Sequence, residues 1–253
     1  MIIEYNRPTS VDEALALLTR NDVHSIPIGG GSSFRRLLII PCAVVDLQEL
    51  DFDEIFERGK FLEVGATVTL QSLQNSQSIS AVLNEIIRFE AGYNLRQVST
   101  IAGTLVAANG RSLLATALLS LDAHLVLMPG DEVVSLGDFL PIRSKWLQGR
   151  LIVAVRFPIN VKLEYEFVAR TPADQPIVCA AIGKWPSGRT RVALGGFGEA
   201  PVLVFDGPQS SGAVAAAKNA YSLAADVWAS SAYRQEIASI LTGRILSRLE
   251  IEQ

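Results

Sequence analysis

The alternation of hydrophobic and polar residues predicts short helices and strands along the first ninety residues. Ser10 and Glu13 form a capping box, in which each side chain can accept a backbone N–H at a helix start. Apolar residues then recur at helical spacing up to Leu18, which indicates one buried face. Thr69 is a second expected cap. We expect a helix from Ser10 to about Asn21, further helices at 70–75 and 79–89, and strands at 24–28, 43–47 and 61–68.

The stretch from Gly92 to Ala123 starts polar, narrows to the small-residue turn Thr100–Thr104 and becomes apolar from Leu113 to Leu121. This pattern predicts a loop that leads into a buried helix. Ser112 is the expected N-cap of that helix, because its hydroxyl can accept a free N–H of the first turn.

The remainder of the chain reads as strands followed by helices. Strands are expected at 123–128, 132–135 and 151–157, with a turn at 129–131, and the pattern changes around 159–162. An antiparallel meander of strands 163–169, 177–184 and 190–195 follows, and Gly195–Gly198 is expected to end it. Two helices, 212–224 and 232–249, finish the chain, the second with Ile237, Ile240, Leu241 and Leu249 toward the core. The sequence therefore predicts an α+β fold with domains at 1–160 and 161–253.

Composition narrows the function classes. The 253 residues are 49% hydrophobic and 19% charged, which is typical of a globular protein with well-buried cores. A net charge of −4 and the lack of a basic run give no basis for nucleic-acid binding. No apolar run is long enough to span a membrane and no signal peptide is evident, so a cytoplasmic location is expected. The two cysteines and two histidines are too few for a metal site, so none is predicted.

Two loops of small residues carry the candidate chemistry. They are Pro27–Ser33 and Thr100–Thr104, and such loops let the main chain turn its N–H groups toward an anion. Together they could hold a pyrophosphate. Neither matches the dinucleotide fingerprint or the P-loop, and each alone is commonly only a turn. Arg35-Arg36 could neutralise phosphate, although a solvated face is the favoured interpretation.

The loops belong to an ordered set of motifs that resembles one family, the flavin subunits of molybdenum hydroxylases. Examples are the medium subunit of carbon monoxide dehydrogenase and the FAD domain of xanthine dehydrogenase. The motifs that carry the resemblance are Tyr5–Pro8, Pro27–Ser32, Val45–Leu47, Val64–Thr69, Leu95-Arg96, Ser99–Gly103, Leu121–Ala123 and Ser231–Arg234. The chain departs from the family pattern at Ala102, Thr104, Gly110 and Leu113, where Gly, Asn, Pro and Asp are common.

The resemblance implies a two-lobed FAD-binding domain of the vanillyl-alcohol oxidase type, followed by a smaller C-terminal domain of meander and helices. It implies an electron-transfer subunit that passes electrons from iron–sulfur clusters through FAD to an acceptor such as NAD. The implied partners are a molybdopterin-containing large subunit and a small subunit with [2Fe–2S] clusters. The resemblance is also compatible with assembly of the three subunits as a dimer of heterotrimers.

The expected cofactor-binding residues are those of the two loops, with no catalytic acid or base in this chain. They are Gly29, Gly30, Gly31, Ser32, Ser33, Thr100, Ile101, Ala102, Gly103 and Thr104. Arg170 could lie near the flavin, although pairing with Asp174 is favoured. The main alternative is a flavin-free structural or assembly subunit, motivated by Thr104 and Leu113. A stand-alone flavin reductase of the related cell-wall precursor type is a third interpretation.

Overall fold

The computed structural model describes residues 1–33, 41–171 and 174–251, so the Arg35-Arg36 pair lies outside the described residues. The described chain forms two units whose segments interleave in the sequence. The first comprises Met1–Ser76, Gly92–Ala107 and His124–Arg156, and the second Gln77–Ala91, Ala108–Ala123 and Phe157–Gln253. The boundary expected at residue 160 divides the chain by sequence alone, and it stays a prediction.

The first unit begins with a small parallel sheet of order β1-β3-β2. Its elements are β1 (Ile2–Asn6), α1 (Val11–Thr19), β2 (Ser25–Ile28) and β3 (Cys42–Asp46). The hydroxyl of Ser10 accepts the N–H of Glu13 at 3.3 Å, and the Glu13 carboxylate accepts the N–H of Thr9 at 3.0 Å. Helix α1 buries Ala14 against Val45 and Leu47. The βαβ-type pattern expected from the sequence is therefore present.

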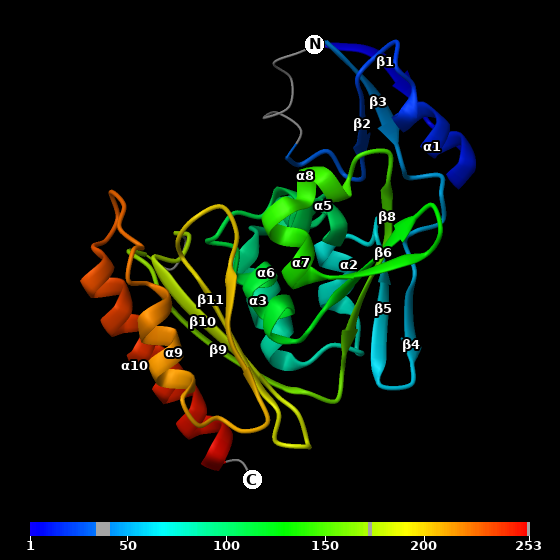
Figure 1. Ribbon diagram of the computed structural model, residues 1–253. Helices are drawn as coiled ribbons and strands as arrows, with labels where there is room; N and C mark the ends of the chain where they lie inside the picture. Colours follow the sequence, from blue (N-terminus) through cyan, green and yellow to red (C-terminus); the bar gives the residue numbers. More distant parts are fainter. Residues whose placement is uncertain (34–40, 172–173, 252–253) are drawn as a thin grey trace. The chain divides into compact units, whose positions relative to one another are not determined.

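The same unit contains a five-stranded sheet of order β4-β5-β8-β6-β7 (Figure 1). The strands are β4 (Ile55–Arg58), β5 (Phe61–Gly65), β6 (His124–Met128), β7 (Glu132–Ser135) and β8 (Leu151–Pro158). The helices are α2 (Leu70–Asn75), α4 (Tyr93–Arg96), α5 (Ile101–Ala107), α7 (Leu136–Phe139), η2 (Leu140–Ile142) and α8 (Arg143–Trp146). Helix α2 has the predicted bounds, because Thr69 accepts the N–H of Ser72 at 3.0 Å.

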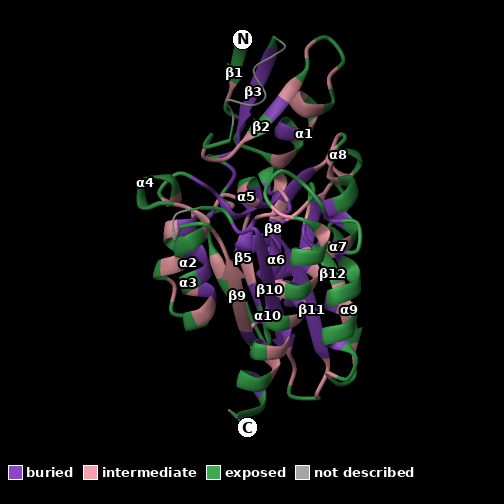
Figure 2. Ribbon diagram, turned by 90° about the vertical axis from the view of Figure 1, so that its left-hand side faces the viewer, coloured by how far each residue is buried: buried purple, intermediate pink, exposed green. Residues whose placement is uncertain are grey.

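The second unit is built on an antiparallel sheet of order β12-β11-β10-β9. Its elements are α3 (Ala81–Glu90), α6 (Leu113–Ser120), β9 (Lys162–Val168), β10 (Val178–Lys184), β11 (Thr190–Gly195), β12 (Val202–Gly207), α9 (Ala213–Ala220) and α10 (Ser231–Ile251). Strands β10 and β11 are buried along most of their length (Figure 2).

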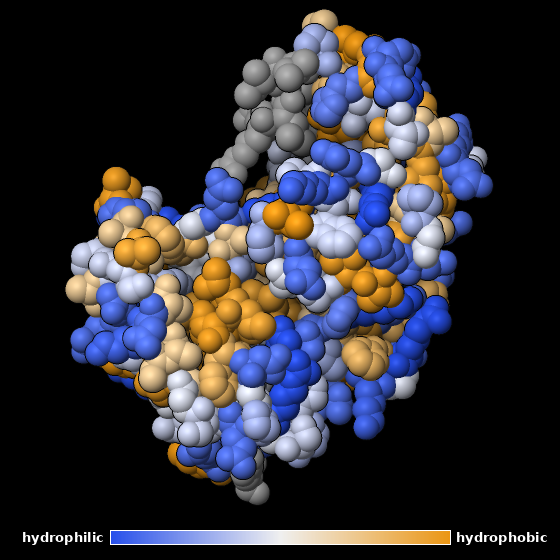
Figure 3. All heavy atoms as spheres, in the orientation of Figure 1, coloured by the Kyte–Doolittle hydropathy of each residue, from blue (hydrophilic) through white to orange (hydrophobic). Residues whose placement is uncertain are grey.

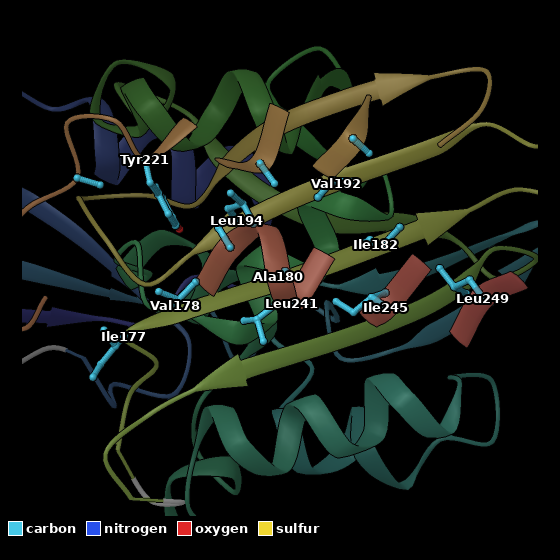
Figure 4. Packing of buried hydrophobic residues seen from close by; sticks show 14 residues of the cluster. Ile177, Val178, Ala180, Ile182, Val192, Leu194, Tyr221, Leu241, Ile245 and Leu249 are labelled. Atoms are coloured by element: carbon cyan, nitrogen blue, oxygen red, sulfur yellow. The ribbon is translucent and has the colours of Figure 1, made fainter. Parts of the chain in front are cut away.

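The two faces of this sheet are covered by different helices. On one face, Ala180 and Ile182 of β10 pack in a cluster with Leu241 and Ile245 of α10 (Figure 4). On the other face, Cys179 lies 3.6 Å from the Thr116 hydroxyl of α6. Every residue of α6 is buried, and its two hydroxyl residues, Thr116 and Ser120, donate to carbonyls within the helix region. The α+β fold class and the meander with helices are confirmed.

The structure corrects three expectations. Thr100–Thr104 is the first turn of α5 with its cap, and it is not a loop. Gly195–Gly198 does not end the sheet, because β12 follows and pairs with β11. Ile240 does not face the core, since 37% of it is exposed on α10. The sequence pattern also missed β1, β4 and the helices between Leu136 and Trp146.

Candidate functional site

The first glycine loop, Gly29–Ser33, follows the end of strand β2, and among the described residues its N–H groups at 30–33 have no acceptor. Gly31 has a φ of +70°, a left-handed conformation that side chains with a Cβ rarely adopt. Ser32 and Ser33 are exposed. Consecutive free N–H groups in such a turn form a concave site for an anion.

A polar network holds the base of this loop. Asp46, at the end of β3, is buried; its carboxylate accepts the hydroxyl of Tyr5 and, at 3.1 Å, the N–H of Gln48. This hydrogen bond from Tyr5, together with desolvation, raises the pKa of the Tyr5 phenol. The Gln48 amide then donates to the carbonyl of Gly29 at 3.3 Å. Asp46 and Gln48 thus position the loop, a role that the sequence did not assign to Gln48.

The second predicted segment, Thr100–Thr104, uses its backbone donors internally. The first N–H groups of a helix lack partners within the helix. In α5, the N–H of Ile101 donates to the carbonyl of Val68 at 2.9 Å, and that of Ala102 to the carbonyl of Ala66 at 3.3 Å. The N–H of Gly103 donates to the Thr100 hydroxyl at 3.1 Å. All three donors that the helix start would offer to an anion are therefore engaged.

The threonine hydroxyls of this segment are engaged as well. Thr100 uses its hydroxyl as the cap of α5, and it is itself buried. The Thr104 hydroxyl donates to the carbonyl of Thr100 at 2.8 Å. Thr104, which stands where the family commonly has Asn, thus satisfies its hydroxyl within its own helix.

The fold brings the two predicted segments into direct contact. A Cβ on Gly30 would lie 1.4 Å from the carbonyl oxygen of Val98, and one on Gly29 would lie 2.9 Å from the Thr100 side chain. Only glycine allows the main chains to approach so closely. Both predicted segments therefore lie in the first unit and approach each other where Gly29 meets Thr100.

Leu113, another departure from the family pattern, begins α6 in the second unit. The N-terminus of α6 is capped twice, since the Ser112 hydroxyl accepts the N–H of Ala115 and the Glu90 carboxylate accepts that of Leu114 at 2.9 Å. The Ser112 hydroxyl also donates to Glu90 at 2.9 Å. Burial raises the pKa of the Glu90 carboxyl, and hydrogen bonds from Leu114, Ser112 and Leu113 oppose that shift.

The region around Arg170 differs from the expected pair with Asp174. The Arg170 guanidinium lies 4.4 Å from the ring centroid of Trp228, and Arg111 lies at the same distance from that ring. The fully buried Arg234 donates to the carbonyls of Ile177 and Gly196, which gives the family-like Ser231–Arg234 motif a structural role. Sequence reasoning gave no indication of the Trp228 cluster.

The described residues contain no group of three or more potential metal-ligating side chains, and none of their helices is long and apolar enough to cross a bilayer. The fold and the site define a class: an α+β protein with a glycine loop suited to the anionic part of a cofactor.

The family model described as "FAD binding domain in molybdopterin dehydrogenase" matches residues 1–160, and the chain belongs to this family, whose cofactor is FAD.

Curated relatives match nearly the whole chain. The uncharacterized protein YgfM of Escherichia coli (strain K12) is 28% identical, over 95% of this chain and 94% of that protein. The carbon monoxide dehydrogenase medium chain of Afipia carboxidovorans is 26% identical, over 97% and 96%. The solved structure of reconstituted CO dehydrogenase from Oligotropha carboxidovorans matches with a TM-score of 0.80 at 25% identity, over 97% of this chain and 96% of that one. These likenesses support an oxidoreductase subunit.

Proposed function

We propose that this chain is the FAD-binding electron-transfer subunit of a molybdenum hydroxylase-type complex. In this role it passes electrons from iron–sulfur clusters on a partner to an acceptor such as NAD. The observation that carries the proposal is the first glycine loop, in which no described residue accepts the N–H groups of residues 30–33 and Gly30 passes close to the main chain of Val98. This is the arrangement that a pyrophosphate needs, because each oxygen can accept several backbone donors.

The two segments contribute differently to the proposed cofactor site. Gly29–Ser33 would hold the pyrophosphate through backbone N–H groups and the hydroxyls of Ser32 and Ser33. Thr100–Thr104 would set the position of that loop, because its own donors are already bonded. FAD, when bound, supplies the exchange of one or two electrons, and the protein supplies binding and orientation.

The proposed partners are a molybdopterin-containing large subunit and a small subunit with [2Fe–2S] clusters. Support comes from the relative named as a medium chain, since that name implies other chains in the same enzyme. The dimer of heterotrimers and the cytoplasmic location stay predictions.

One alternative has specific support: a flavin-free subunit that serves assembly. The buried, apolar Leu113 and the engaged donors of α5 both favour it, because each removes a group that could bind the nucleotide. The first loop favours the cofactor-binding function, since Gly31 has a left-handed backbone and no described residue accepts the N–H groups of residues 30–33.

A visible absorption spectrum of the purified chain separates the two functions. The spectrum is recorded before and after addition of FAD, with excess FAD removed by gel filtration. Flavin bands that elute with the protein support the electron-transfer subunit. A folded chain that stays colourless, alone and in complex with its partner subunits, contradicts the proposal and leaves the assembly function.

A further inference from the structure

The loop between α9 and α10, residues 221–230, is fixed by hydrogen bonds to the carboxylate of Asp226. Arg234 is fully buried and donates to the Asp226 carboxylate at 2.7 Å. The same carboxylate oxygen accepts the N–H groups of Trp228 at 2.8 Å and Ala229 at 3.1 Å. Three donors on one carboxylate fix the backbone at Trp228, so this part of the loop is preorganised.

Two guanidinium groups lie close to the indole ring of Trp228. Arg111 and Arg170 each lie 4.4 Å from the Trp228 centroid, a distance at which the cation–π attraction is strong. Arg111 is tethered by hydrogen bonds to the carbonyls of Pro176 at 2.6 Å and Gln175 at 3.2 Å. Arg170 is exposed, and no described residue forms an ion pair or hydrogen bond with it. No acceptor among the described residues therefore competes with an outside one for its N–H groups.

Apolar side chains on the same loop stand in solvent. Leu223 is 90% exposed and Val227 is 92% exposed, while 42% of Trp228 is exposed. Figure 3 shows hydrophobic atoms at the position that this loop has in Figure 1. Large apolar side chains on a rigid loop beside a free guanidinium are typical of binding surfaces, in which tryptophan and arginine carry most of the affinity.

The charged side chains around Trp228 favour a partner that carries a carboxylate. The Asp226 carboxylate is already paired with the buried Arg234 at 2.7 Å, so the two guanidinium groups at the ring are those of Arg111 and the exposed Arg170. Burial and the charge of Arg234 lower the pKa of Arg111, which indicates that positive charges crowd here. An incoming carboxylate would relieve that crowding and could accept both N–H groups on one edge of Arg170.

We infer that the exposed surface of Leu223, Val227, Trp228 and Arg170 binds a segment of another subunit that carries a carboxylate beside an apolar side chain. The inference rests on the proposed function for the existence of that subunit. Trp228 and Val227 receive the apolar side chain and Arg170 receives the carboxylate.

The test is the affinity of the chain for its partner subunits, co-produced and purified as a subcomplex, measured by biolayer interferometry. Trp228→Ala is expected to weaken association by about 30-fold, the change typical of an interface hot spot. Arg170→Glu is expected to weaken it by about tenfold or more and to reduce its salt dependence. Because Arg170 is on the surface, this second variant keeps the test valid if Trp228→Ala misfolds.

Trp185→Ala is the matched control, because Trp185 also lies beside an arginine, with Arg189 at 4.8 Å, in the same unit. It should change association by less than twofold. Wild-type affinity for the partner subunits in both Trp228→Ala and Arg170→Glu would overturn the inference. The inference would also be overturned if these variants bound the partner subunits normally and instead lost association between copies of this chain.

Flavin content, read from visible absorption of each sample, keeps this test separate from the cofactor proposal. A wild-type chain that binds FAD but forms no complex contradicts the inferred binding surface and leaves the cofactor proposal intact. A colourless chain that assembles through Trp228 supports the surface and contradicts the electron-transfer function.

Discussion

The two small-residue segments of the first unit touch each other yet use their backbones in opposite ways. In Gly29–Ser33, the N–H groups of residues 30–33 have no acceptor among the described residues. In Thr100–Thr104, the N–H groups at the start of α5 are bonded to Val68, Ala66 and Thr100. Similar composition therefore serves two purposes. In the proposed site, the first segment binds the ligand and the second holds the first in place.

The largest effect is expected at Gly30. Its Cβ in Gly30→Ala would fall 1.4 Å from the Val98 carbonyl oxygen, and a backbone atom cannot move aside as a flexible side chain can. We expect FAD affinity to fall by more than about 100-fold and the free energy of unfolding to drop by about 3 kcal/mol, the upper range of overpacking costs. FAD titration and urea unfolding measure the two quantities.

Gly92→Ala is the control for this variant, since a Cβ at the exposed Gly92 meets nothing within 4 Å. It should leave both quantities within error of wild type. If Gly30→Ala bound FAD normally, the contact between the two segments would not matter to the site.

Gly31 tests the shape of the first loop without a clash. Its φ of +70° is strained for alanine, while the space around it is open. The strain is about 1–2 kcal/mol, so Gly31→Ala should lower FAD affinity by roughly tenfold if the bound loop keeps this conformation. Gly31→Asn should retain more affinity, because asparagine tolerates left-handed backbone. Equal affinities in the two variants would argue against this loop conformation in the complex.

Thr100 tests the supporting role of the second segment. Thr100→Val removes the hydroxyl that accepts the Gly103 N–H, and loss of such a cap costs about 1 kcal/mol of unfolding free energy. Thr100→Ser keeps the cap and should be nearly as stable as wild type. We expect FAD affinity to fall only about threefold in Thr100→Val, measured by fluorescence quenching of FAD. A loss above 100-fold with unchanged stability would instead make the hydroxyl a ligand.

A small effect is expected at Gly103, which is exposed on α5. A Cβ there would lie 2.8 Å from the Thr100 hydroxyl oxygen, and the helix preference of alanine over glycine offsets part of the adjustment. Gly103→Ala should therefore change FAD affinity by less than about threefold in the same titration. A loss comparable to that of Gly30→Ala would show that the two segments contribute equally.

Local signals made several elements predictable from the sequence. Thr69 caps α2 through a residue three positions away, so the bounds of that helix follow from adjacent sequence. Ser112 and the apolar run after it likewise predicted α6. The end of the meander was predicted wrongly because the glycines of Gly195–Gly198 are typical of the end of a sheet. In the structure, Gly196 is needed for another reason, since its backbone passes close to those of Gly110 and Ile177.

The sequence predicted the two segments of the candidate site but not the contacts that each of them makes. The motifs that resemble the family identified both segments, yet the acceptors of the α5 donors come from Ala66 and Val68, more than thirty residues away. The support of Gly29 by Gln48 and the meeting of Arg111 and Arg170 at Trp228 depend on similar long-range packing. No local pattern encodes such contacts.

The most direct test of the central claim is a pair of FAD titrations, followed by visible absorption, on Ser32→Ala/Ser33→Ala and on Thr104→Val. The serine hydroxyls are exposed on the first loop, whereas the Thr104 hydroxyl is bonded within α5. We predict about a tenfold or greater loss of FAD affinity for the serine variant, since hydrogen bonds to a charged group contribute about 1.5–3 kcal/mol, and less than about a twofold change for Thr104→Val. The reverse order of effects would contradict the claim that the first loop holds the cofactor and the second supports it.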